Sequence, residues 1–155
     1  MDWKDRIKQA QDKAAAAREQ DLAKREQIYK EWRAKLAKND AFMRATVEPQ
    51  FREVASAVKA AGYTSQVETP GLAEGTRKFI EACELVITKS KNVEPRKGNR
   101  IKIEPSPVHP GHYFISVSFE NPRVHQKEQH VAADKVTKGF IEGELAAFVD
   151  TIVGA

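Results

Sequence analysis

The chain has 155 residues, of which 41% are hydrophobic and 31% are charged, enough for one sizeable core and too few for two independent large domains. Its charged start and the lack of any long apolar run argue against a signal peptide and a transmembrane helix, so we expect no membrane contact and a cytoplasmic location. The formal net charge of +4 lies within residues 1–45, which hold twelve Lys/Arg and eight Asp/Glu, whereas residues 46–155 hold fourteen of each.

The first predicted element is one long helix over roughly residues 2–44. Ala, Lys, Arg, Glu, Gln and Leu dominate this stretch, which contains no Gly or Pro, and these residues lose the least freedom in a helix. A straight helix of this length spans about 60 Å, more than the rest of the chain needs to cover itself. We therefore expect residues 1–45 to form a helical arm on an α+β domain of residues 46–155.

Two apolar stripes run along the predicted arm. Spacings of four and three residues, as in coiled coils, relate the members of the first stripe: Trp3, Ile7, Ala10, Ala14 and Ala17. The register then slips, and a bulkier stripe follows: Leu22, Ile28, Tyr29, Trp32 and Leu36. These ten residues are the predicted interface with a second copy, most simply in a dimer, or with a helical protein partner.

The two halves of the arm have different expected roles. The half from Trp3 to Ala17 is the part that we expect to project and meet another molecule. The half from Leu22 to Met43 is expected to pack on its own domain or on a close partner. For Trp3 and Trp32, two readings stay open, because large aromatics here either fold back on the sheet or anchor an interface.

A second helix is predicted to follow the arm. The arm is expected to pause near residue 39 or to run on to about 45, and Thr46 then suits an N-cap with Pro49 in the first turn. Gly62 is placed to end this helix. Further strands are predicted at 63–68 and, as one central strand, at 77–88, with a turn at 69–75 between them.

The last part of the chain predicts more strands and a closing helix. Strands are expected at 100–104 and 112–120, and at 123–131 as a polar edge strand. The final helix starts near Thr137, with a stripe of Ile141, Leu145, Phe148 and Ile152. The predicted class is α+β: a long N-terminal helix, a second helix, an antiparallel sheet of about four strands, and a C-terminal helix packed on one sheet face.

A basic connection is the second candidate site. It carries six bases within fourteen residues: Lys89, Lys91, Arg96, Lys97, Arg100 and Lys102. Such a loop suits phosphate contact in a nucleic-acid-binding accessory protein. The competing interpretation is a solvated loop, and the absence of aromatic residues between Lys89 and Lys102 counts against base stacking.

Catalytic and metal chemistry have little support in the sequence. The pairs His109/His112 and His125/His130 could meet if their strands pair, but histidines at this spacing without cysteines are a weak zinc signal. The lone Cys83 lies in an apolar run and is expected to pack as a small hydrophobe. No phosphate loop or nucleophile motif occurs, so we predict no catalytic residues, no metal ligands and no cofactor.

These patterns favour a non-enzymatic interaction protein. Its arm would bind a second copy or a protein partner, and its α+β domain would supply a second binding surface. Nucleic-acid binding through the basic connection is the alternative, and a metal-dependent or other enzyme is a distant third. No motif in the chain specifies a reaction.

Overall fold

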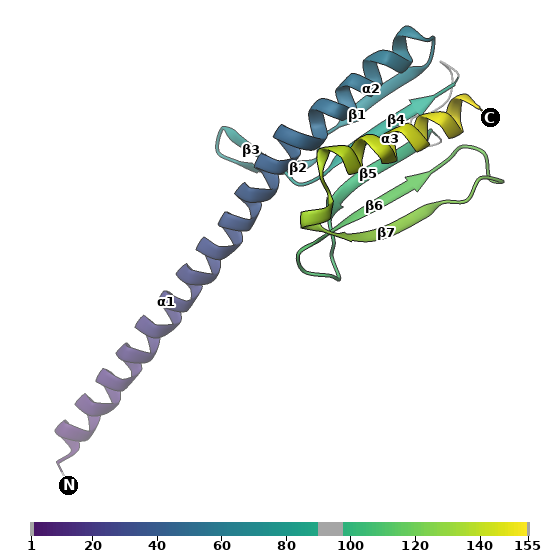
Figure 1. Ribbon diagram of the computed structural model, residues 1–155. Helices are drawn as coiled ribbons and strands as arrows, with labels where there is room; N and C mark the ends of the chain where they lie inside the picture. The colour runs from purple at the N-terminus through teal and green to yellow at the C-terminus, as the bar shows by residue number, and fades with distance from the viewer. Residues whose placement is uncertain (1, 90–97, 155) are drawn as a thin grey trace. The chain divides into compact units, whose positions relative to one another are not determined.

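A computed structural model describes residues 2–89 and 98–154 of the chain (Figure 1). The chain consists of two compact units, residues 1–37 and residues 38–155. The helices are α1 (Trp3–Phe42), η1 (Met43–Val47), α2 (Glu48–Ala60), η3 (Ala133–Lys135) and α3 (Lys138–Val153). The strands are β1 (Thr64–Glu68), β2 (Gly71–Glu74), β3 (Arg77–Ile80), β4 (Cys83–Thr88), β5 (Asn99–Pro105), β6 (His112–Ser118) and β7 (Lys127–Ala132). The predicted α+β class with a long N-terminal helix is confirmed.

The first unit is a single helix, the part of α1 up to residue 37. Asp2 starts the helix, since its carboxylate accepts a hydrogen bond from the Lys4 backbone N–H at 3.0 Å. This contact satisfies one of the first N–H groups, which have no partner within a helix. We call residues 2–37 the arm from here on.

The helix does not pause at residues 39–46. α1 continues through the π-helical turn η1 into α2, so of the two predicted alternatives the pause near residue 39 is wrong, and Thr46 is helical and not the predicted N-cap. Met43, Val47 and Phe51 are all fully buried. In a regular α-helix a spacing of four residues drifts by about 40° per step. The wider π-turn reduces this drift and keeps the three side chains on one face.

Pro49 explains why the backbone hydrogen-bond pattern changes from α-helical to π-helical in η1. It has no N–H to give to the carbonyl four residues earlier, and the turn before it uses a five-residue bond from the Glu48 N–H to the Met43 carbonyl. The side-chain amide of Gln50 donates to the Thr46 carbonyl at 2.8 Å. Thr46 and Pro49, which predicted a helix start, therefore lie inside a continuous helix.

The main sheet has five antiparallel strands in the order β1-β4-β5-β6-β7. The count is one more than the approximate four expected, and β2 and β3 form a separate two-stranded sheet. The last strand, β7, lies at an edge as predicted. Figure 1 shows α2 and α3 side by side on one face of the main sheet.

The predicted strand at 77–88 is wrong as a single strand, because the chain breaks into β3 and β4 at residues 81–82, and only β4 lies inside the main sheet. Residues of α1 and η1 hold this break. The Asp40 carboxylate accepts from the Ile80 N–H at 2.7 Å, and the Asn39 amide donates to the carbonyls of Ile80 and Glu81, each at 3.1 Å. The Arg44 guanidinium donates to the Lys78 carbonyl at 2.7 Å. These long-range contacts compete with strand continuity and separate the two sheets.

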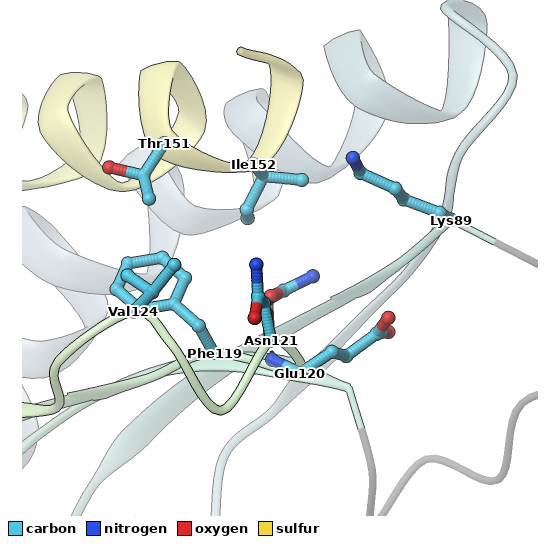
Figure 2. Close-up of a pocket in the computed structure, with 8 residues that line it drawn as sticks. Lys89, Phe119, Glu120, Asn121, Val124, Thr151 and Ile152 are labelled. Carbon is cyan, nitrogen blue, oxygen red and sulfur yellow. Dashed lines mark hydrogen bonds between the residues drawn. The ribbon is translucent and has the colours of Figure 1, made fainter. Parts of the chain in front are cut away.

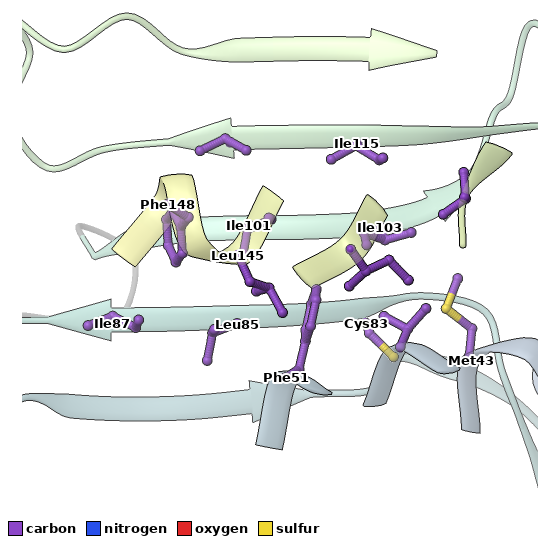
Figure 3. Packing of buried hydrophobic residues seen from close by; sticks show 14 of the residues in the cluster. Met43, Phe51, Cys83, Leu85, Ile87, Ile101, Ile103, Ile115, Leu145 and Phe148 are labelled. Atoms are coloured by element: carbon purple, nitrogen blue, oxygen red, sulfur yellow. The ribbon is translucent and has the colours of Figure 1, made fainter. Parts of the chain in front are cut away.

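The core lies between the sheet and the two helices α2 and α3 (Figure 3). Alternate strand residues point into it, among them Leu85, Ile101 and Val117, which the strand register places side by side. Phe51 of α2 and Phe148 of α3 cover them from the helical side. Cys83 is fully buried in this core, as predicted.

The ends of the helices follow sequence signals more closely. Thr137 caps α3, since its hydroxyl oxygen accepts from the Phe140 N–H at 3.2 Å. Gly62 follows α2 with a φ of 98°, a conformation that costs glycine little. In the described ranges 2–89 and 98–154, no helix is both long and apolar enough to cross a membrane.

Candidate functional site

The arm carries most of the exposed bulky apolar side chains. Nine large hydrophobic side chains are exposed among the described residues, and six of them belong to the arm: Trp3, Ile7, Leu22, Ile28, Tyr29 and Trp32. Trp3 is 67% exposed and Trp32 is 45% exposed. A soluble chain tolerates single exposed apolar residues, but a series along one helix is typical of an interaction surface.

The arm's predicted interface residues differ in burial. Ala10, Ala14 and Ala17 are exposed. Leu36 is the exception among the ten, with 8% exposure. The next buried side chains along the helix are those of Asp40 and Met43, which belong to the second unit.

Local contacts order the aromatic side chains of the arm. Tyr29 and Trp32 are tilted neighbours with ring centroids 5.8 Å apart. The Arg6 guanidinium lies 5.7 Å from the centroid of the Trp3 ring, a distance at which a cation is attracted to the ring face. Trp32 therefore has a second aromatic ring close to it, and Trp3 has a base close to it.

The basic connection is described only in part. Lys91, Arg96 and Lys97 lie outside the described residues. Lys89 lies beside a cavity, Arg100 pairs with Glu84, and Lys102 pairs with Glu104 at 3.2 Å. Because two of the three described bases already face carboxylates, their net attraction for phosphate is reduced.

Three of the four histidines come together near the β5–β6 loop. The ring centroid of His109 lies 4.7 Å from that of His130 and 5.8 Å from that of His112. The His112 Nδ1 donates to the Pro110 carbonyl at 3.0 Å, which leaves Nε2 without the proton in the neutral ring. His125, which the sequence paired with His130, has no such contact in the described part of the chain.

Ser106 supports the histidine cluster without the features of a nucleophile. Its hydroxyl oxygen accepts from the N–H groups of Val108 and His109, at 3.3 and 3.0 Å. The hydroxyl proton then points to the Nδ1 of His130, 2.8 Å away. Ser106 thus holds the loop closed, and across residues 2–89 and 98–154 no three His, Cys, Asp or Glu side chains are grouped to hold a metal ion.

A cavity of about 330 Å³ lies beside the C-terminal end of α3 (Figure 2). Thr151 and Ile152 of α3 face Phe119 and Val124 across it, and Lys89 lies at one side. Its most buried polar side chain, Asn99, already donates to the Ile87 carbonyl and accepts from the Glu120 N–H, both at 3.0 Å. The cavity has the size of a small ligand site, but Asn99 is used to hold β4 to the end of β6.

Sequence reasoning missed both this cavity and a groove between α2 and α3. The lining residues of the cavity come from the residue after β4, from β5, from the segment after β6 and from α3, so no local pattern unites them. The groove could have been found, since on each helix its residues follow spacings of three, one, three and one.

Comparison with known proteins places this chain in no family. No family model, no curated protein and no solved structure matches it.

Proposed function

We propose that this protein is a non-enzymatic interaction protein whose arm binds a helix, either of a second copy or of a helical partner. The observation that carries the proposal is the series of six exposed bulky apolar side chains between Trp3 and Trp32. Covering such side chains gains roughly 25 cal/mol for each Å² of apolar surface removed from water. A second helix with a matching stripe supplies that cover.

The two halves of the arm suit different modes of contact. Alanines at 10, 14 and 17 leave room for a close helix–helix approach but bury little area. Tyr29 and Trp32 offer large rigid rings of the kind that dominates binding energy at interfaces. The alanine-rich half, residues 3–17, therefore sets the distance between the two helices, and the half with the larger side chains, residues 22–36, supplies most of the affinity.

The α+β domain offers a second binding surface on the sheet face opposite the helices. Strand alternation turns Glu84, Arg100, Lys102 and Glu104 to this face, where register sets opposite charges next to one another. A face of paired charges favours a polar, specific contact over a nonspecific hydrophobic contact.

Analytical ultracentrifugation tests the self-association form of the proposal. We expect the full chain to associate at micromolar concentrations and the double variant Tyr29→Ala/Trp32→Ala to dissociate at least about tenfold more readily, a loss of about 1.4 kcal/mol. Gln9→Ala/Gln11→Ala is the matched control, because it also changes two exposed arm residues. A monomer at hundreds of micromolar would contradict self-association.

Nucleic-acid binding through the basic connection stays the alternative. Binding would fall steeply with salt, and Arg96→Ala/Lys97→Ala/Arg100→Ala would weaken it. No binding to single- or double-stranded DNA or RNA at low salt would remove this alternative. That the protein is not an enzyme also stays a prediction.

A further inference from the structure

A groove of about 380 Å³ runs between α2 and α3 in the second unit. On α2 it is lined by residues at positions 50, 53, 54, 57 and 58, and on α3 by residues at 142, 145, 146, 149 and 150. Each set is one stripe of a helix, whose inner members Val58 and Leu145 also belong to the core and whose other members lie further out. The two stripes therefore face the same opening from opposite sides.

Small and apolar side chains form the floor of the groove. Ala57 and Ala146 are exposed, and Val54 and Val149 are half-buried. Alanine leaves open the space that a longer side chain would fill between packed helices. The opening is thus apolar at the bottom and wide enough for a bulky side chain.

Carboxylates flank this floor. Glu53, Glu142 and Asp150 line the groove and are exposed, and none of the bases that the structure describes lines it. None of the three carboxylates has an ion-pair partner in the described part of the chain. The groove therefore combines an apolar floor with an unbalanced negative charge, which favours an apolar occupant with basic flanks.

Gln50 adds an unused acceptor to the groove. It is 7% exposed, and its amide Nε2 is fixed by the bond to the Thr46 carbonyl. Its Oε1 is buried without a hydrogen-bond partner among the described residues. A buried acceptor without a partner destabilises the folded chain, and a donor from an occupant would remove part of that cost.

We infer that the groove binds the start of the arm of a second copy, with Trp3 and Ile7 on its floor. This inference rests on the proposed function and names the surface that the arm recognises. Lys4, Arg6 and Lys8 flank the two apolar residues and outnumber Asp2 and Asp5 of the same stretch, so residues 2–8 carry a net positive charge, opposite in sign to the groove. The indole N–H is a donor with no acceptor role, and it would pair with the Gln50 oxygen after that buried side chain turns toward the groove.

The chemistry of the groove selects this occupant over others. Three unpaired carboxylates repel the phosphates of nucleic acid. An apolar helix without bases would leave the carboxylates unpaired, whereas the arm brings ten Lys/Arg against seven Asp/Glu in residues 1–37. If each of two copies places its arm in the groove of the other, the result is a closed dimer. If each arm instead binds the groove of a third copy, the assembly grows into an open chain.

Charge exchange in the full chain tests the groove. We expect Glu142→Lys/Asp150→Lys to raise the dissociation constant of the dimer at least about tenfold at low salt. Adding Lys4→Glu/Lys8→Glu to the same chain should recover most of that loss, because the signs then match again. Glu128→Lys, an exposed reversal on β7, is the control and should leave association unchanged.

Disulfide trapping identifies the neighbours directly, because the native Cys83 is fully buried. Full chains carrying Ala10→Cys are mixed with tagged full chains carrying Ala146→Cys and oxidised gently. A crosslink between the two variants, distinguished by the tag, is the expected result. Both substitutions replace exposed alanines, so circular dichroism should show unchanged folding.

The outcomes separate the two proposals. Association that survives the groove reversals, with Ala10→Cys chains crosslinking only to each other, overturns the groove site and leaves arm-to-arm binding standing. A monomeric full chain overturns both the groove site and self-association. Loss of association on groove reversal, recovery with the reversed arm, and the mixed crosslink together support the inference.

Discussion

Asp40 is a charged side chain placed where the helix meets the two sheets of the second unit. It is 4% exposed and accepts hydrogen bonds from the Ile80 N–H at 2.7 Å and from the Arg44 Nε at 2.9 Å. Burial by itself raises the pKa of Asp40, but the Ile80 N–H, the Arg44 contact and the charge of Arg77 outweigh it and lower the pKa below its usual value. The folded protein therefore favours the ionised carboxylate.

Replacing Asp40 should destabilise the second unit in a pH-dependent way. We expect Asp40→Asn to lose about 1.5–3 kcal/mol of unfolding free energy at pH 7, because a charge-assisted contact is lost. A lowered folded pKa gives stability that is present above the unfolded value near 4 and is lost as pH falls through the folded pKa. Urea unfolding at pH 7 and at pH 3 measures this difference, which should shrink in acid.

Asp134→Asn is the matched control for this measurement, since Asp134 is exposed in the same unit. It should leave the unfolding free energy within about 0.5 kcal/mol of the parent at both pH values. An equal loss at pH 7 and pH 3 in Asp40→Asn would show that shape, and not charge, is what Asp40 supplies.

Cys83 should be inert to thiol reagents in the native protein. Burial in the core, with the charge of Glu48 nearby, raises the pKa of its thiol to about 12, so almost no thiolate is present at pH 8. Native protein should react with a thiol reagent only at the rate of unfolding, and protein in urea should react at once. Fast modification of the native chain would contradict the burial of Cys83.

At the scale of elements, the helices of the second unit differ in what fixes their starts. α2 begins inside a longer helix through the π-turn, so its position depends on the buried residues Met43, Val47 and Phe51. α3 begins at a local signal, the Thr137 cap. The first start depends on packing and the second on neighbouring residues.

The Thr137 cap gives a direct test of the local signal. Thr137→Ala should destabilise the second unit by about 1 kcal/mol, because the Phe140 N–H loses its acceptor. Thr137→Ser keeps the hydroxyl and should remain within a few tenths of a kcal/mol of the parent. Chemical denaturation of the three proteins would decide this, and equal losses in both variants would argue against capping.

At the scale of the whole molecule, the second unit has its own core. The buried cluster begins at Met43 and includes residues of every strand from β4 to β6 and of both helices that cover the sheet. Among the described residues, no hydrophobic side chain before Phe42 belongs to that cluster or packs against it. The arm should therefore be dispensable for folding and needed for association.

A chain without residues 2–35 should still unfold cooperatively, with a midpoint close to that of the full chain. Phe51→Ala in the full chain should instead lose about 3–5 kcal/mol, because it empties a fully buried site. Thermal unfolding followed by circular dichroism compares the three proteins. Loss of the cooperative transition on truncation would mean that the arm is part of the fold.

Several local patterns were sufficient to predict structure. The polar–apolar alternation of Arg100 to Glu104 predicted β5, the spacing from Ile141 to Ile152 predicted α3, and the composition of the arm predicted one long helix. The apolar stripes of the arm also identified the candidate surface, and the structure leaves six of its bulky residues exposed. In each case the deciding interactions lie within one element.

The sequence by itself determined the class of the fold, the arm and its stripes, because helix propensity and side-chain period act between near neighbours. Only the tertiary structure decided where the chain passes from β3 to β4, since Asp40 binds Ile80 from forty residues away. It also decided that a π-turn joins α1 to α2, and that Glu53 of α2 and Glu142 of α3 share one groove. Those features depend on contacts between distant segments, which no local pattern records.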